Sequence, residues 1–318
     1  MDKVCFVGFD TSNYTTSISV CDGEECIIAN LKSPLPVSSG ERGLRQSDAV
    51  FAHVKNLPAL CDKLCEVIKD YRVLGVGVSS RPRSVEGSYM PCFLSGVAAA
   101  NAFAAAIDAP LLEFSHQDGH VMAAVYSSGA EDKLLRGDFL SFHVSGGTTE
   151  MMLTRPEKKS FSLELVGCTA DINAGQLIDR VGVGMGLDFP CGAAIERLAA
   201  EFSGKDKKSR VVVKEIDSKI VCNLSGIENI SMKMYSESQN KCEVASYVFA
   251  NVRDTLSEMA RLALLEYGEM PVLFAGGVMS NKLMRKTFAQ RFEAYFAEPA
   301  FSADNAAGIA LLCRKSLI

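Results

Sequence analysis

The start of the chain alternates short apolar segments with polar turns, and this pattern predicts β-structure. Residues 4–9 are apolar, residues 10–16 are rich in hydroxyl groups, and residues 17–20 alternate between polar and apolar side chains. Strict alternation is typical of a strand with one buried face. We therefore predict a hairpin with small polar groups in its turn; such groups suit a phosphate but occur more often in an ordinary turn.

Helical periodicity follows between residues 46 and 71. Apolar side chains recur there every three or four residues, which predicts a helix with these buried positions: Ala49, His53, Leu57, Leu60 and Leu64. Residues 30–45 contain two prolines and two glycines and predict a loop. Residues 73–79 predict a buried strand, and residues 93–107 a helix of small side chains.

The same strand, turn and strand recur in the second half of the chain. Residues 139–144 and 150–153 are mostly apolar and enclose the polar segment 145–149. Two similar hairpins indicate an internal duplication, with both turns facing one ligand. The pattern in the remaining sequence predicts helices over residues 171–186, 193–202, 242–267 and 306–312, and strands over residues 211–221 and 271–275.

Length, charge and cysteine content limit the class of protein. A chain of 318 residues suits two lobes, and its net charge of −5 gives no independent support for nucleic-acid binding. The eleven cysteines show no Cys-x-x-Cys spacing, so we predict reduced thiols in a cytoplasmic protein without a signal peptide. The longest apolar segment, residues 96–112, contains Asn101 and Asp108, and we predict no membrane span.

Two of the four histidines are four residues apart, at the start of a predicted helix. Ser115 is a candidate N-cap, and His116 and His120 would lie on one helix face, where both imidazoles could bind one metal ion. Two half-exposed histidines without a shared role are an equally common outcome. Asp304, before the last helix, could be its N-cap.

Glycines after strands mark candidate phosphate sites. Ser145-Gly146-Gly147 follows one strand, and Gly276-Gly277 follows another at a helix start, where a nucleotide often lies. Each signal is weak alone. Arg81 and Arg83 could face an anion or be solvated. The lysines of residues 203–209 are expected to form a solvated turn.

Six motifs, in order, resemble the tRNA N6-threonylcarbamoyladenosine transferase family, formerly called O-sialoglycoprotein endopeptidases. They are Val7-Gly8-Phe9-Asp10-Thr11-Ser12, His116-x-x-Gly119-His120, Ser145-Gly146-Gly147, Asp188-Phe189-Pro190-Cys191-Gly192, Gly276-Gly277-Val278-x-x-Asn281 and Asp304-Asn305. The resemblance extends from residue 4 to about residue 312. It implies an α/β protein of the actin/Hsp70-like (ASKHA) fold, with two duplicated ribonuclease-H-like lobes and a cleft between them. The expected lobes are residues 1–137 with 296–318, and residues 138–295.

The resemblance also implies a metal, a nucleotide and a reaction. The expected ligands of one zinc or iron ion are His116, His120 and Asp304. The expected nucleotide or substrate contacts are Thr11, Ser145, Gly146, Gly147, Asp179, Gly192, Gly276, Gly277 and Asn281. The implied substrate is threonylcarbamoyl-adenylate, whose acyl group would pass to a tRNA adenine with release of AMP. No catalytic acid or base is assigned, and a partner protein or a dimer is expected.

The chain departs from the family pattern at several charged or small positions. Tyr14 and Thr15 replace an acidic pair, and Glu228 replaces a lysine. Arg81-Pro82-Arg83 replaces Gly-Pro-Gly, and Cys191 replaces a glycine. These changes suggest a diverged paralogue, and the alternative function is a regulatory or assembly subunit that binds nucleotide and metal. A metalloprotease is disfavoured because no His-Glu-x-x-His occurs.

Overall fold

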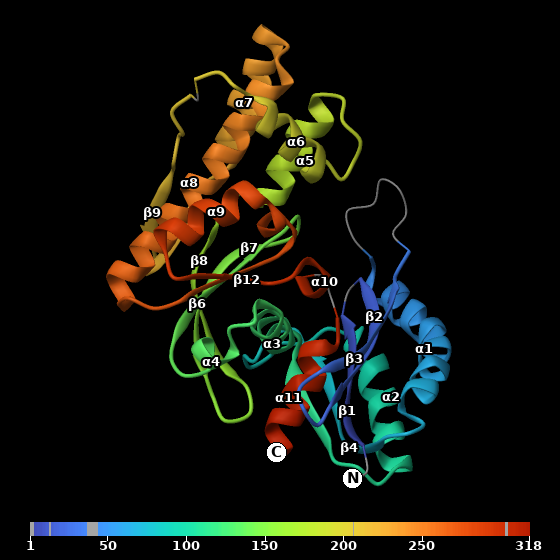
Figure 1. Cartoon of the computed structure of the whole chain (residues 1–318). Helices are drawn as coiled ribbons and strands as arrows, with labels where there is room; N and C mark the ends of the chain where they lie inside the picture. Colours follow the sequence, from blue (N-terminus) through green and yellow to red (C-terminus); the bar gives the residue numbers. More distant parts are fainter. Residues whose placement is uncertain (1–2, 13, 37–43, 206, 303–304) are drawn as a thin grey trace. The chain divides into compact units, whose positions relative to one another are not determined.

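Contacts within the chain define two compact units. The computed structural model describes residues 3–12, 14–36, 44–205, 207–302 and 305–318 (Figure 1). Unit 1 contains residues 1–131, 156–162 and 300–318, and unit 2 contains residues 132–155 and 163–299. Among the described residues, no helix is both long and apolar enough to cross a membrane.

Unit 1 is built on a five-stranded sheet. Its strand order is β3-β2-β1-β4-β5. The strands β1 and β2 are antiparallel, as are β2 and β3, while β4 is parallel to both β1 and β5. The bounds are β1 Val4–Ser12, β2 Thr15–Asp22, β3 Ile27–Pro34, β4 Arg72–Arg81 and β5 Leu111–Ser115.

Helices cover both faces of this sheet. Figure 1 shows α1 and α2 on one face and α3 and α11 on the other. The bounds are α1 Gln46–Ile68, α2 Phe93–Ala106, α3 His116–Ser128, α4 Glu131–Leu134, α10 Pro299–Ser302 and α11 Ala307–Leu317; α4 extends into unit 2, as does α10. The five predicted buried positions of α1 are confirmed.

The side chains of β1 alternate between these two layers. Cys5, Val7 and Phe9 belong to the core that α1 and α2 cover. Gly8 points the other way, where an added Cβ would lie 2.5 Å from the Ala310 nitrogen of α11. Glycine therefore lets α11 pack directly against the sheet.

Unit 2 is built on a seven-stranded sheet in the order β12-β11-β6-β7-β8-β10-β9. The pairing of β6 with β7 is antiparallel and that of β6 with β11 is parallel, as for β1 with β2 and β4. This recurrence agrees with the predicted duplication. The strand bounds are β6 Phe139–Val144, β7 Thr149–Pro156, β8 Phe161–Thr169, β9 Val213–Ile216, β10 Lys219–Cys222, β11 Val272–Ala275 and β12 Ala294–Phe296; β7 and β8 have their ends in unit 1.

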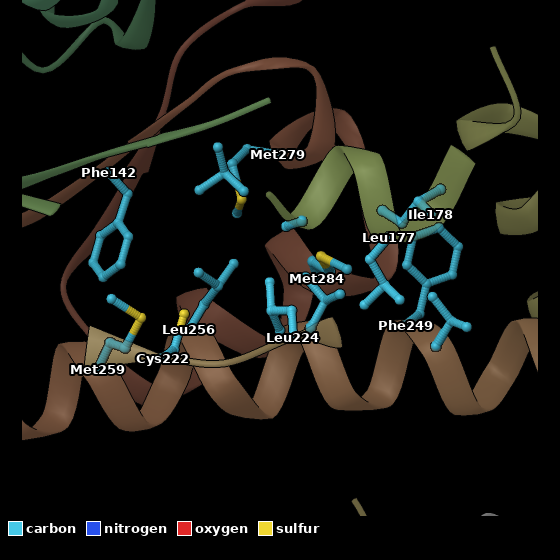
Figure 2. Close-up of a cluster of buried hydrophobic side chains, with 14 of the residues drawn as sticks. Phe142, Leu177, Ile178, Cys222, Leu224, Phe249, Leu256, Met259, Met279 and Met284 are labelled. Atoms are coloured by element: carbon cyan, nitrogen blue, oxygen red, sulfur yellow. The ribbon is translucent and has the colours of Figure 1, made fainter. Parts of the chain in front are cut away.

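Helices pack on this second sheet through a large apolar core. Figure 2 shows side chains from several helices and strands meeting above α8, including Phe142, Leu177 and Met259. The bounds are α5 Ala174–Gly184, α6 Gly192–Glu201, α7 Ser225–Ser238, α8 Lys241–Tyr267, η1 Gly277–Ser280 and α9 Lys282–Arg291.

Some predicted elements are wrong. The first polar turn is shorter than residues 10–16, because β1 continues to Ser12 and β2 begins at Thr15. Residues 30–34 belong to β3. Residues 211–221 contain a hairpin, β9 and β10, and its turn residues Asp217 and Ser218 have φ of 49° and 58°. The sequence pattern also missed α7, in which the buried side chains are Ile227, Ser231 and Met234.

Candidate functional site

The first turn of α3 is fixed by its N-cap, as the sequence predicts. The Ser115 hydroxyl accepts a hydrogen bond from the Asp118 N–H, and the Asp118 carboxylate accepts one from the Ser115 N–H. This reciprocal capping box satisfies two backbone donors. Asp118 also accepts a hydrogen bond from Ser84, and the Gln117 N–H donates to the Pro82 oxygen. The segment from Arg81, the last residue of β4, to Ser84 is thereby attached to the start of α3.

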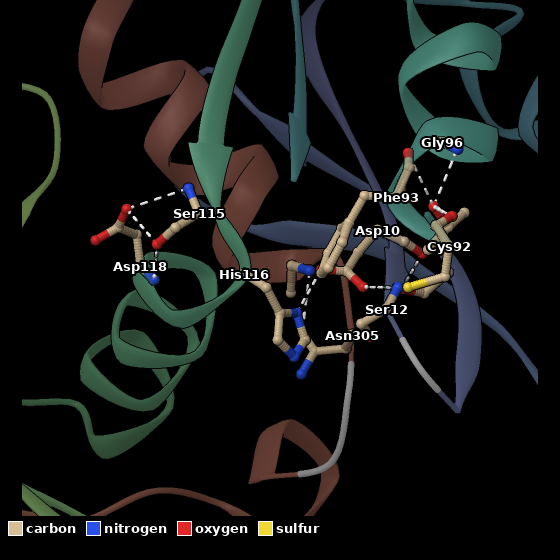
Figure 3. A network of polar contacts seen from close by, with 12 residues as sticks. Asp10, Ser12, Cys92, Phe93, Gly96, Ser115, His116, Asp118 and Asn305 are labelled. Atoms are coloured by element: carbon tan, nitrogen blue, oxygen red, sulfur yellow. Dashed lines mark hydrogen bonds and ion pairs between the residues drawn. The ribbon is translucent and has the colours of Figure 1, made fainter. Parts of the chain in front are cut away.

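The two predicted histidine ligands lie together on α3. The ring centroids of His116 and His120 are 4.3 Å apart, with their planes at 73°. His116 Nδ1 lies 2.7 Å from Asp10 Oδ2, and Asp10 is only 1% exposed (Figure 3). The ring of Phe93 packs against His116 with centroids 6.0 Å apart. Asp10 and Phe93 therefore hold the His116 ring in one orientation.

A close helix crossing brings the start of α11 to these histidines. An added Cβ on Gly308 would lie 1.9 Å from the Gly119 oxygen, so only glycine permits this approach. Asn305 is 4% exposed, its Oδ1 accepts a hydrogen bond from the Ala307 N–H, and Figure 3 shows it beside His116. The predicted ligand Asp304 lies outside the described residues. Among the described residues, no group of three or more His, Cys, Asp or Glu side chains could hold a metal.

The two adjacent imidazoles are donors of the kind that bind divalent metals, and the described residues supply these two rather than a set of three. An ionised carboxylate only accepts hydrogen bonds, so an ionised Asp10 would require the proton of this contact to be on His116 Nδ1. His116 Nε2 is then the nitrogen suited to a metal bond. A carboxylate on the second nitrogen is the usual support for a metal-binding histidine. Sequence reasoning did not assign this role to Asp10; an acidic residue near the end of a strand was the available signal.

Thr11 is buried within β1 rather than exposed in a turn. Its hydroxyl donates to the Cys92 oxygen at 3.0 Å and accepts a hydrogen bond from the Gly96 N–H at 3.0 Å. These contacts fix the first turn of α2, which includes Phe93. The observed position therefore gives Thr11 a structural role, while its predicted nucleotide contact stays a prediction.

The Ser145-Gly146-Gly147 loop of unit 2 rests on the start of α5. The Ser145 hydroxyl accepts hydrogen bonds from the Gly147 and Thr148 N–H groups, and the Ser145 oxygen accepts one from the Gly175 N–H. No described atom lies within 4 Å of a Cβ added to Gly146 or Gly147. Packing does not require glycine at these two positions, so they leave the backbone open to an incoming group.

The Gly276-Gly277 segment lies beside this loop. Gly276 has φ of 100°, and its added Cβ would meet the Val144 oxygen at 2.2 Å, so the fold itself requires this glycine. Gly277 has open space instead. Asn281 caps α9 by accepting the Met284 N–H at 2.9 Å. The Asn281 Nδ2 is buried and has no hydrogen-bond partner among the described residues.

The predicted contacts Asp179 and Gly192 lie close together, because Cys191, the residue before Gly192, is hydrogen-bonded to Asp179. The Cys191 N–H donates to Asp179 Oδ1 at 2.8 Å, immediately before Gly192 begins α6. Burial raises the pKa of Asp179, and the Cys191 hydrogen bond opposes this rise. Cys191 is buried with its side chain against Gly182, where an added Cβ would lie 2.5 Å from the Cys191 Sγ. The small residue at position 182 therefore accommodates the cysteine.

The charge reversal at Glu228 has a local partner. Glu228 Oε2 lies 3.3 Å from Arg180 Nη1 of α5, and the two side chains form an exposed ion pair. Tyr14, the other altered position that the structure describes in the first turn of the chain, is 43% exposed. The altered charge at position 228 is therefore balanced within unit 2.

Two surface hollows of unit 2 lie elsewhere, along α8 and α9. They measure about 660 and 510 Å³ and share Arg261, Arg291 and Phe292. Their lining includes none of the predicted site residues.

The duplicated sheets define the class as the actin/Hsp70-like (ASKHA) fold. The chain is similar in structure to full-length HypF, with a TM-score of 0.59 and 14% identity over 99% of this chain and 56% of that one. It is also similar to component A of (R)-2-hydroxyglutaryl-CoA dehydratase from Acidaminococcus fermentans, with a TM-score of 0.54 and 15% identity over 98% of both chains. A third similar structure is the activator of 2-hydroxyisocaproyl-CoA dehydratase from Clostridium difficile with bound ADPNP. Its TM-score is 0.52, with 11% identity over 98% of this chain and 94% of that one.

Sequence comparison narrows this class to one family. The family model described as tRNA N6-adenosine threonylcarbamoyltransferase (TsaD) matches residues 39–311. The chain belongs to this family of acyltransferases of the tRNA-modifying kind. A relative of that name from Sulfurihydrogenibium sp. is 27% identical over 96% of this chain and 88% of its own length, and one from Mycoplasmopsis synoviae is 26% identical over 96% of both. A relative from Streptococcus sanguinis is 29% identical over 90% of this chain and 84% of its own length.

Proposed function

We propose that the chain is a metal- and nucleotide-dependent transferase that takes threonylcarbamoyl, or a related carbamoyl group, from an adenylate. Membership of the family supports the reaction class. The proposal of nucleotide binding rests on three glycines of unit 2. Gly146, Gly147 and Gly277 each have empty space where a side chain would fit. Backbone N–H groups that are free of side chains can approach phosphate oxygens closely.

The remaining nucleotide contacts follow from donors and acceptors already in place. Asn281 offers a buried Nδ2 donor without a partner among the described residues. One carboxylate oxygen of Asp179 accepts a hydrogen bond from the Cys191 N–H, and the other oxygen could accept one from a ribose hydroxyl. Ser145 would orient the loop rather than bind directly, since its hydroxyl accepts two N–H groups within the loop.

The proposed metal ligands are His116, His120 and Asp304. The support is the adjacent pair of imidazoles, with a carboxylate on the far nitrogen of His116. When bound, zinc or ferrous iron would polarise an oxygen of the substrate. Two histidines and one carboxylate leave coordination positions open for that oxygen.

A partner protein is part of this proposal. The net charge of −5 provides no strong field for tRNA, so a partner would supply that surface. The second candidate function, a regulatory or assembly subunit, rests on the uncharged Tyr14 and Thr15. The chemistry at His116 and His120 favours the transferase, because a scaffold has no use for an open metal site.

Nucleotide binding is tested by Gly147→Val. The valine side chain fits the fold, because no described atom lies within 4 Å of the Cβ position, and it would block backbone approach. Calorimetry with ATP, ADP and AMP should show binding by the natural chain and at least a tenfold weaker affinity in the variant. Gly137→Val is the matched control, since Gly137 also has open space but lies outside the loops. Absence of binding by the natural chain to all three nucleotides would refute the nucleotide proposal.

A further inference from the structure

Two hydrogen bonds of Asp10 to described residues constrain each other. Its Oδ1 accepts the Ser12 N–H at 2.9 Å, and its Oδ2 lies 2.7 Å from His116 Nδ1. Asp10 is 1% exposed, so neither contact is exposed to competing water. The Ser12 N–H is a backbone donor and always requires an acceptor.

We propose that Asp10 is a positioning residue that keeps the proton of His116 on Nδ1 and so leaves the ring's lone pair on Nε2. This inference rests on the metal site of the proposed function and adds a residue that determines the state of one ligand. The Phe93 ring against His116 limits rotation of the imidazole, so the hydrogen bond determines the tautomer as well as the orientation.

An asparagine at position 10 would reverse this arrangement. Asparagine has the shape of aspartate but only one oxygen, and the Ser12 N–H requires that oxygen. The amide NH₂ group would then face His116 Nδ1, which must give up its proton to accept the new hydrogen bond. The proton would move to Nε2, the nitrogen that must be bare to bind a metal.

The tautomer can be read directly, because the chain has only four histidines. The full chain is labelled with ¹⁵N in histidine, freed of metal, and studied by two-bond ¹H–¹⁵N correlation at about pH 9, where an ordinary imidazole is neutral. His116→Gln assigns the resonances. We expect protonated Nδ1 in the natural chain and unprotonated Nδ1 in Asp10→Asn.

Asp118→Asn is the matched control. Asp118 is equally buried and lies in the first turn of the same helix, but its carboxylate contacts Ser115 and Ser84 instead of His116. The tautomer of His116 should be unchanged in this variant. Circular dichroism of each variant shows whether the fold is retained.

Metal affinity provides a second measurement. Titration with Zn²⁺ should show a 10- to 100-fold weaker affinity in Asp10→Asn, the range expected for losing such a supporting carboxylate. A protonated Nδ1 in Asp10→Asn would overturn the inference about Asp10. Failure of the natural chain to bind Zn²⁺ would instead refute the metal site, while the tautomer result would stand independently.

Discussion

At the residue scale, single atoms without partners indicate the chemistry of the site. Asn281 is an example, because its Oδ1 caps α9 while its Nδ2 is buried without a hydrogen-bond partner among the described residues. An unsatisfied buried donor costs about 1–3 kcal/mol, so its persistence suggests a ligand that completes it. The sequence alone indicates an asparagine at a helix start and cannot show that half of the amide is unused.

Asn281→Asp separates the two roles of this amide. Aspartate keeps the N-cap acceptor, but its second oxygen replaces a buried Nδ2 that has no partner among the described residues, so the free energy of unfolding should fall by about 1–3 kcal/mol. The donor becomes an acceptor, and adenine nucleotide affinity should fall about tenfold or more, the loss expected for a hydrogen bond to a charged or polar ligand. Calorimetry and urea unfolding measure the two quantities. Unchanged nucleotide affinity would exclude Asn281 from the binding site.

At the element scale, local patterns predicted much of the fold. Helical spacing predicted α1 with its five buried positions, and the Ser115 cap predicted the start of α3. Local patterns failed where distant residues complete an element. Leu224 precedes α7 and has no capping side chain of its own, so this helix start carries no local signal. The contact of Asp10 with His116 spans 106 residues and could not be read from either motif.

Asp171 supplies the missing cap of α7 from the end of β8. Its carboxylate accepts hydrogen bonds from the Leu224 and Ser225 N–H groups and the Ser225 hydroxyl. Burial would raise the pKa of Asp171, but these hydrogen bonds outweigh it and hold the pKa well below its usual range. Asp171→Ala should lower the free energy of unfolding by about 1 kcal/mol, the usual cost of a lost cap.

The pH dependence of this effect has a definite sign. A lowered pKa in the folded state stabilises the fold fully above the ordinary carboxyl pKa of about 4, and this stabilisation declines as the pH falls below it. Urea unfolding should therefore show a constant difference between the natural chain and Asp171→Ala above about pH 5, and a shrinking difference towards pH 3. Asp132→Ala, at a fully exposed carboxylate, is the control and should change stability little at any pH. A difference that grows in acid would contradict the assigned role.

At the scale of the whole molecule, the chain has the family fold with altered charges. Tyr14 and Thr15 stand where the family pattern has an acidic pair. Arg81, at the end of β4, and Arg83, just after it, add positive charge on a segment attached to α3. Glu228 is a weaker argument for altered activity than the sequence suggested, because Arg180 balances it. These changes favour a chain that retains its ligands but depends on a partner for transfer to tRNA.

We therefore expect that the chain alone does not replace a housekeeping threonylcarbamoyl transferase. Expression in a strain that lacks the housekeeping enzyme should give weak growth or none, and little modified adenosine in tRNA. The double variant Tyr14→Asp with Thr15→Glu restores the acidic pair. Some transfer activity should return in this variant. Full rescue by the unaltered chain would show that it has the ordinary family activity without a dedicated partner.

The metal content of the gently purified chain tests the central claim most directly. Elemental analysis should find a single zinc or iron ion per natural chain and the same content in His143→Ala, a histidine on β6 outside the predicted ligand set. The metal should be lost from His116→Ala, His120→Ala and Asp304→Ala, each of which removes one proposed ligand. Equal metal content in the natural chain and His116→Ala would contradict the proposed metal site and the metal-dependent transfer built on it.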